Sequence, residues 1–161
     1  MSVRESLLLT LDDALAYWNY DIELNFNRAY RIDQIQQEAL RVPGVVAAES
    51  WGFSNARRQR PDKTESTNIL VIAPPAQTTM LNPILIEGRW LLPDDENAVV
   101  INTDVIKNEA DLKVGDELVL KINNRDSTWK IVGIVKGVLA GPFAYANYPY
   151  YAQTVREVGR A

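Results

Sequence analysis

The segment 88–138 constrains the fold most, because it carries two strand signals joined by a turn signal. Leu118, Leu120 and Ile122 recur at every second position, so they share one face of a strand predicted over 117–122. Asn-Asn-Arg-Asp at 123–126 follows, and Asn and Asp tolerate the backbone conformations of a hairpin turn. A second strand is then predicted over 128–135.

The second strand is apolar on both faces. We expect one face to carry Trp129, Ile131 and Val135, and the other to carry Val132 and Ile134. A strand that is apolar on both sides is buried on both sides, as in a closed or nearly closed barrel.

Turn and capping residues organise the chain before this hairpin. An acidic turn at 93–97 precedes a predicted strand over 98–101, and Asn102 or Thr103 can cap a short helix that runs to about residue 108. In the turn at 112–116, Gly115 permits a positive φ and Asp116 can accept hydrogen bonds from nearby backbone amides.

The first part of the chain alternates helices with strands. Apolar residues at helical spacing predict helices over 4–18 and 31–42, and strict alternation predicts a strand over 20–28. A further strand is expected to begin within 45–53. Strand, helix and strand in this order form a βαβ or split-βαβ element.

The remaining segments complete an α+β fold in two lobes. The polar, basic stretch 55–63 predicts a solvated hairpin tip, and the apolar run in 68–73 predicts a central strand. A loop over 77–83 marks the lobe boundary. A last strand (143–148) and a helix (150–158) that begins at Pro149 return to the first half.

We therefore predict two lobes with different architectures. Residues 1–83 and 139–161 form a porter-like lobe with a mixed sheet and βαβ-type helices. Residues 84–138 form a small lobe of mostly antiparallel strands.

Composition argues against several function classes. The 161 residues include no His and no Cys, which removes histidine-dependent triads, His-ligated zinc and thiol nucleophiles. A formal charge of −4 argues against nucleic acid as a partner. No G-x-S-x-G, G-x-G-x-x-G or Walker A motif occurs. We assign no catalytic, cofactor-binding or metal-binding residue, and we predict that the chain is not an enzyme.

Two groups of side chains remain as candidate sites. The acidic group Asp94, Asp95, Glu96 and Asp104 lacks the spacing of a calcium loop, so we interpret it as an acidic turn next to a strand. The aromatic group covers the seam between the two halves or forms an exposed contact patch. It consists of Phe143, Tyr145, Tyr148, Tyr150 and Tyr151, and its four tyrosines are the candidate partner contacts.

The order of motifs after residue 83 resembles a known family. E-G-R-W-L at 87–91, an acidic turn, A-V-V-I-N, a short helix, L-K-V-G-D and W-K-I-V-G-I-V follow one another. In that order the chain resembles the extracytoplasmic core domain of ABC-transporter permeases of the MacB/FtsX/LolC type. The resemblance is to an architecture, because none of these motifs is catalytic.

The resemblance implies a domain on the periplasmic or extracellular side of the cell membrane. Such a domain binds a substrate or a partner protein and transmits motion, without catalysis and without cofactors. Its partners would be the membrane helices of the parent permease, a cognate ABC ATPase subunit and an extracytoplasmic protein or substrate, in a dimeric transporter. The helix over 4–18 would pack on the core, continue a transmembrane helix, or do both.

Two alternatives stay open at this point. The chain could be a free-standing soluble hydrolase that uses paired carboxylates, or a β-barrel adaptor that binds another protein through its aromatic C-terminal segment.

Overall fold

The computed structural model describes residues 51–78, 81–138 and 141–159. The predicted helices over 4–18 and 31–42, the strand over 20–28 and the first part of the strand over 45–53 lie outside the described residues.

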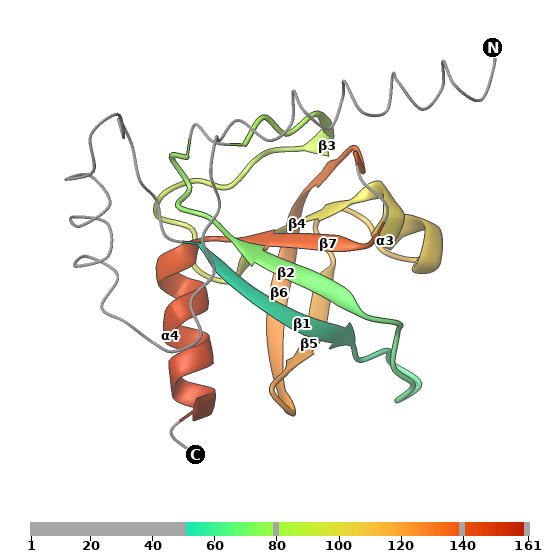
Figure 1. The fold of residues 1–161 in the computed structure, drawn as a ribbon. Coiled ribbons are helices and arrows are strands. Elements are labelled where there is room, and N and C mark those ends of the chain that lie inside the picture. Colours follow the sequence, from blue (N-terminus) through green and yellow to red (C-terminus); the bar gives the residue numbers. More distant parts are fainter. Residues whose placement is uncertain (1–50, 79–80, 139–140, 160–161) are drawn as a thin grey trace, which may run out of the picture.

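Seven strands in these ranges form one mixed sheet with the order β3-β6-β4-β7-β2-β1-β5. In chain order the elements are β1 Gly52–Arg58, β2 Ile69–Ala73, β3 Leu85–Gly88, β4 Ala98–Asn102, α3 Thr103–Asn108, β5 Glu117–Ile122, β6 Arg125–Val135, β7 Phe143–Ala146 and α4 Tyr148–Gly159. An additional pairing of β5 with β6 joins the end of this order back to β6. The sheet therefore closes into a barrel, and β3 extends it as an outer strand (Figure 1).

The long strand β6 connects the parts of this barrel. One of its edges pairs in parallel with β4, and its other edge pairs antiparallel with β5 and then with β3. The β4–β6 register shifts between Val99 and Val100, which face Ile131 and Gly133, so Val132 is an extra residue in a bulge.

The bulge corrects the predicted faces of β6. Trp129, Ile131 and Ile134 belong to one buried cluster, whereas Val132 and Val135 belong to the other. The prediction for Ile134 and Val135 is therefore wrong, because strict alternation does not continue across a bulge.

Local chemistry around the hairpin agrees with the sequence. β5 has the predicted bounds, and Asn123 and Asn124 adopt φ of 51° and 64°, as a two-residue hairpin turn requires. β6 begins at Arg125, earlier than predicted. Asn102 caps α3 by accepting a hydrogen bond from the Val105 amide, and Gly115 has a φ of 97°.

The apolar core lies on both sides of the barrel wall. The inner cluster takes residues from all six barrel strands, including Ala56, Val71 and Leu118. The outer cluster combines the opposite faces of β2, β4, β6 and β7 with Leu81 and Leu91 from the β2–β4 connection.

The described strands confirm a mixed sheet with few helices, as an α+β fold requires. Strands from both predicted lobes contribute to the same sheet: β1, β2 and β7 come from one and β3 to β6 from the other. The division into two lobes, 1–83 with 139–161 and 84–138, stays a prediction.

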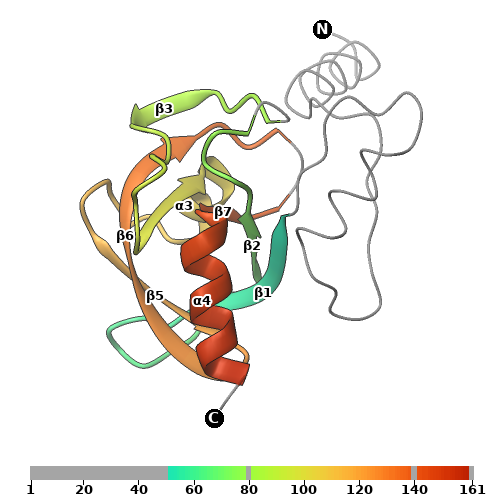
Figure 2. The same ribbon diagram turned by 90° about the vertical axis from the view of Figure 1, so that its left-hand side faces the viewer.

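The two helices lie on opposite sides of the barrel, as Figures 1 and 2 show from two directions. α3 buries Val105 in the inner cluster, and α4 packs Tyr151 against the same cluster. Neither described helix combines the length and the apolar character that a membrane span needs.

Candidate functional site

The most specific contacts of the described structure attach α4 to the barrel. The ring of Tyr151 is only 6% exposed and packs over Gly52 on β1, where a Cβ atom would lie 2.1 Å from Tyr151 Cε1. The hydroxyl of Tyr151 forms a hydrogen bond with Ser54 Oγ, in which either oxygen can donate. Burial raises the pKa of the Tyr151 phenol, so the group stays protonated and able to donate.

A second aromatic contact lies on the same side of the barrel. The rings of Tyr150 and Trp129 are 5.3 Å apart and nearly perpendicular, which is a favourable edge-to-face geometry. Trp129 Nε1 donates to Ser127 Oγ at 2.7 Å, and Ser127 Oγ in turn donates to the Leu120 carbonyl. The indole that supports α4 is therefore fixed by a hydrogen bond as well as by packing.

The start of α4 is tied to two loops. Asn147 is buried, and its Nδ2 donates to the carbonyls of Leu92 at 2.6 Å and Asp95 at 3.0 Å. The Tyr148 amide donates to the Pro74 carbonyl. Position 147 was not a candidate in the sequence, because a single Asn before a helix gives no signal of its distant partners.

The candidate tyrosines occupy different environments. Tyr145 is 1% exposed in the outer cluster, where its ring contacts Trp90 and Phe143 at centroid distances of 5.4 and 6.5 Å. Tyr148 and Tyr150 are half-buried against the inner cluster. The burial of Tyr145 and Tyr151 supports an internal role for these two rings, and a direct partner contact of the four tyrosines stays a prediction.

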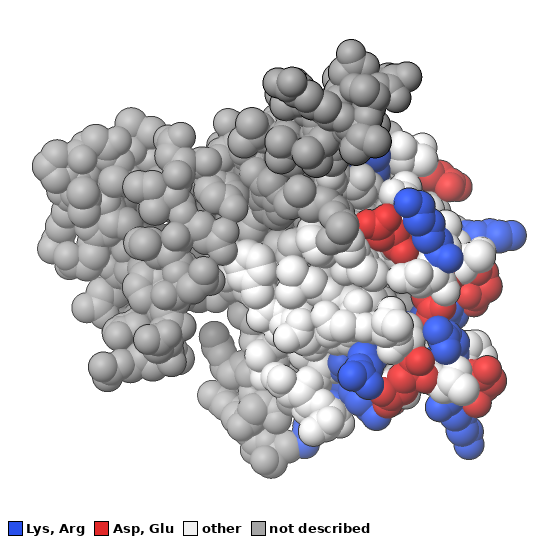
Figure 3. Space-filling model, turned by 45° about the vertical axis from the view of Figure 1, so that its right-hand side comes forward, with Lys and Arg blue, Asp and Glu red and all other residues white. Residues whose placement is uncertain are grey.

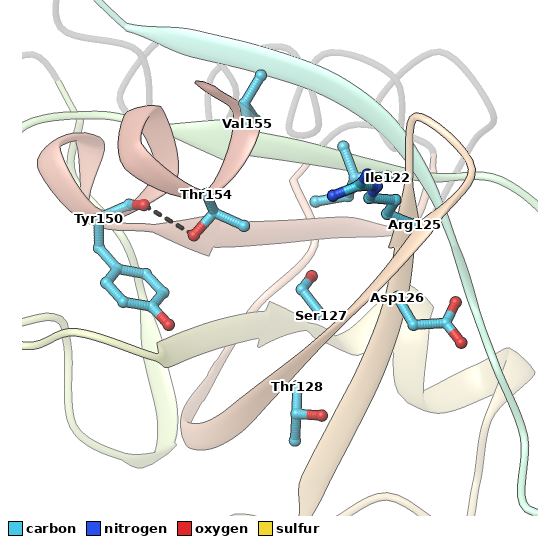
Figure 4. A pocket seen from close by; sticks show the side chains of 8 residues that line it. All are labelled: Ile122, Arg125, Asp126, Ser127, Thr128, Tyr150, Thr154 and Val155. Atoms are coloured by element: carbon cyan, nitrogen blue, oxygen red, sulfur yellow. Dashed lines mark hydrogen bonds between the residues drawn. The ribbon is translucent and has the colours of Figure 1, made fainter. Parts of the chain in front are cut away.

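A small polar pocket opens between α4 and the β5–β6 hairpin (Figure 4). Its volume is about 270 Å³, and α4 borders it with Tyr150 and Thr154. Among the described residues that line it, Asp126 is the one carboxylate. These lining residues therefore do not include a pair of carboxylates, as a hydrolase of the alternative kind needs.

The acidic group divides between two structural roles. Asp95 accepts two hydrogen bonds from Arg89, at 2.7 and 3.1 Å, and one from the Leu92 amide. These contacts, the Arg89 guanidinium first, lower the pKa of Asp95. Asp104 instead accepts from the Gly141 amide and lies near Lys107. Across the described ranges, no three Asp or Glu side chains lie where they could share a metal ion.

The basic stretch 55–63 departs from the predicted solvated tip. β1 continues to Arg58, whose side chain is buried and donates to both carboxylate oxygens of Asp111, at 2.8 and 2.7 Å. Glu109, 4% exposed, lies 3.7 Å from Arg58 and accepts from Arg60 at 2.9 Å. The prediction of a fully solvated stretch is therefore wrong for Arg58, which joins the end of β1 to the α3–β5 connection.

Acidic and basic side chains are also mixed around Glu65, which lies between β1 and β2. Lys121 donates to Glu65 at 3.0 Å, and Arg57 lies 3.6 Å from the same carboxylate. Figure 3 shows acidic and basic side chains interleaved along one side of the face in view. Such a pattern produces no large field of one sign that would attract a polyanion.

Comparisons with known proteins agree on one architecture. The family model described as the MacB-like periplasmic core domain matches residues 8–160. The extracellular domain of the noncanonic ABC-type transporter YknZ from Gram-positive bacteria matches at a TM-score of 0.59 and 14% identity, over 87% of this chain and 74% of that chain. The periplasmic region of MacB from Actinobacillus actinomycetemcomitans matches at 0.56 and 12%, over 87% and 66%.

At these identities the two solved structures show a shared fold alone. Because this chain covers 66% of the MacB region, part of that region has no counterpart here. Among curated proteins, no sequence matches the chain significantly.

Proposed function

Because the chain belongs to the MacB-like periplasmic core domain family, it is an extracytoplasmic domain of an ABC-transporter permease, and we propose that it transmits motion and binds partners without catalysing a reaction. In this proposal, the membrane part of the permease moves the C-terminal helix α4. The barrel follows α4 as a rigid body, and its surface contacts a substrate or a partner protein.

The attachment of α4 is the observation that carries the proposal. The aromatic ring over Gly52, the edge-to-face pair with Trp129 and the buried amide of Asn147 fix the helix at three separate places. These contacts reach β1, β6 and the acidic turn, so a displacement of α4 is expected to move the whole barrel. A helix held by loose apolar contacts alone would slip instead.

The absence of catalysis is supported by the carboxyl groups. The described carboxylates with shifted pKa values, Asp62, Glu65, Asp95 and Asp111, all shift downward, because hydrogen-bond donors stabilise their charged forms. A general acid near neutral pH needs the opposite shift. The pocket beside α4 contributes a single carboxylate.

The partners follow the family. Permeases of this family work with ATPase subunits, and we propose a cognate ATPase on the cytoplasmic side and a dimeric transporter. The chain carries no Walker A motif, so the ATPase would be a separate polypeptide or domain.

The test uses the complete parent permease with its ATPase, purified in lipid discs. Since the chain lacks Cys, Lys113→Cys in the exposed turn before β5 gives this domain a single labelling site once cysteines elsewhere in the permease are replaced. A spin label there reports the position of the barrel. We expect ATP to change the distance between labels of the two copies, and Tyr151→Ala to abolish this change while ATP hydrolysis continues.

The matched control is Ile101→Ala, which also removes a buried side chain from the inner cluster but breaks none of the hydrogen bonds that hold α4. It should retain the ATP-dependent distance change. If Tyr151→Ala and Ile101→Ala behave alike, or if ATP never moves the label, motion transmission through α4 is refuted.

A further inference from the structure

We infer that β3 accepts an extended, apolar segment of a partner protein that carries basic residues at one end, and pairs with it as an added strand. This inference gives a surface to the partner binding proposed above and so rests on that proposal. Four observations about β3 and its neighbours support it.

The first is a concentration of exposed aliphatic side chains. Ile84, Leu85, Ile86 and Leu92 are 43%, 46%, 57% and 52% exposed, and Phe53 is the one other large apolar side chain of the described residues exposed to this degree. Single exposed apolar residues are ordinary. Four within one short segment form a patch of the kind that marks interaction sites. We call these four residues the β3 surface.

The second is an open sheet edge. Within the described part of the chain, β3 pairs with β6 and with no other strand, so its second edge presents unpaired backbone groups. Proteins protect such edges with lysine, proline or a covering element. β3 contains no lysine or proline, and all its positions are exposed. Its protection is limited to the charge of Glu87 and a register shift between Leu85 and Glu87. An edge of this kind is the acceptor in strand addition.

The third is rigidity. The Lys136 amide donates to the Ile84 carbonyl at 2.8 Å, and the Arg89 amide donates to the Val132 carbonyl at 2.9 Å. Gly88 has a φ of 73°, and a Cβ atom there would lie 2.3 Å from the Val132 oxygen. β3 is thus held close to β6 at both ends, so little ordering entropy opposes the addition of a strand.

The fourth observation is the negative charge on and beside β3, which favours a partner with basic residues. Glu87 lies on β3, and the Arg89–Asp95 ion pair holds the turn with Asp94 and Glu96 beside the end of β3. Arg89 is neutralised by Asp95, whereas Glu87, Asp94 and Glu96 form no ion pair with any described residue. A partner with Lys or Arg next to Gly88 would complement these carboxylates.

The same charges disfavour two other occupants. A second copy of the chain, paired antiparallel as two-fold symmetry requires, would place its own charged end away from Glu87, Asp94 and Glu96, and would leave these carboxylates without a counter-charge. An anionic lipid surface would be repelled by the same three carboxylates. A basic, apolar polypeptide segment is therefore the occupant that the chemistry favours.

The experiment measures peptide binding to the 161-residue chain by fluorescence anisotropy. The probe alternates threonine with valine and carries three lysines at one end. We expect Ile86→Lys to raise the Kd at least about tenfold, because a lysine on the edge opposes strand addition. Phe53→Lys is the matched control, an apolar residue on β1 that is 45% exposed, and should change the Kd less than about twofold.

Two further measurements test the charge argument and the fold. The triple variant Glu87→Gln, Asp94→Asn, Glu96→Gln should weaken binding and flatten its dependence on salt. Urea unfolding should show that Ile86→Lys is as stable as the parent chain, since the side chain is exposed. Hydrogen exchange should slow within 85–88 when the peptide is bound.

Several results would overturn the inference. These are no binding of the probe, equal binding to Ile86→Lys, and equal binding of a peptide with glutamates in place of the lysines. Self-association that Ile86→Lys abolishes would assign the surface to a second copy instead. Binding to phosphatidylglycerol vesicles through β3 would assign it to lipid. Each can occur while the spin-label experiment succeeds, so the two proposals fail separately.

Discussion

The substitution Gly52→Ala tests whether Tyr151 fills the space over β1. An alanine Cβ would lie 2.1 Å from Cε1, 2.6 Å from Cδ1 and 3.0 Å from Cζ of the tyrosine ring, whereas ordinary contacts begin near 3.4 Å. The ring of Tyr151 cannot move away freely, because it is buried and its hydroxyl is hydrogen-bonded to Ser54. Overpacking of this kind destabilises a protein by about 1–3 kcal/mol.

A second effect of Gly52→Ala, on the unfolded state, reduces this expected loss of stability. Gly52 does not have a positive φ, so alanine is compatible with its backbone and stabilises by about 0.4–1 kcal/mol through the unfolded state. The net loss should be about 1–2 kcal/mol, measured by urea unfolding with tryptophan fluorescence. In a Tyr151→Ala background the clash is gone, and Gly52→Ala should then stabilise the chain by about 0.5 kcal/mol.

The effect of Gly52→Ala on the free energy of unfolding should therefore have opposite signs in the two backgrounds. A structural role for Gly52 unrelated to Tyr151 would give the same loss in both backgrounds. A loss that persists in Tyr151→Ala, or no loss in the parent chain, refutes the packing of α4 on β1.

Three further predictions concern other parts of the barrel. Arg58→Met should lower the free energy of unfolding, measured in urea, by about 2 kcal/mol, because buried Glu109 loses one of its two counter-charges and keeps its hydrogen bonds to Arg60. Asp111→Asn at an exposed carboxylate should lower it by less than about 1 kcal/mol. Equal losses would contradict this account. The lowered pKa of Asp95 means that its contribution to stability is complete above the unfolded pKa of about 3.9 and disappears as the pH falls through the folded value. Between pH 5 and pH 3, the free energy of unfolding in urea should therefore fall less for Asp95→Asn than for the parent chain. An identical fall in both would show that the Arg89–Asp95 pair does not contribute to stability. Asn124→Gly should stabilise the hairpin by a few tenths of a kcal/mol and Asn124→Val should destabilise it by about 1–2 kcal/mol, since the position has a φ of 64°; thermal melts would compare the two variants, and similar melting temperatures would argue against a left-handed turn.

Local chemistry explains what the sequence could predict. The bounds of β5, the Asn102 cap, the turn at Gly115 and the helix after β7 depend on residues within a few positions of each other. Alternation fails where a single extra residue enters, and Val132 is that residue in β6. The one local signal was Gly133, next to Val132, because an isolated glycine inside a strand pattern is typical of a bulge or of a close backbone approach. A Cβ atom at Gly133 would lie 2.0 Å from the Arg89 carbonyl oxygen.

The contacts that attach α4 to the barrel could not be predicted from neighbouring residues in the sequence. Ser54 and Tyr151 are 97 positions apart, and Arg58 and Asp111 are 53 positions apart. A pattern of residue types predicts that a Tyr or an Arg needs a partner, but the partner is chosen by the closure of the barrel. Similarly, no strand is predicted from the sequence at the Ile-Leu-Ile run of 84–86, and only the sheet order shows that this run includes part of an edge strand.

The last strand in the chain occupies an interior place in the sheet. β7 pairs in parallel with β2 and antiparallel with β4, so it separates two strands that were synthesised long before it. Until residues 143–146 leave the ribosome, β2 and β4 have no strand between them and the barrel cannot close. Residues up to 146 should therefore cross the membrane before this domain acquires its native structure, and its unpaired strands are prone to aggregation during that interval.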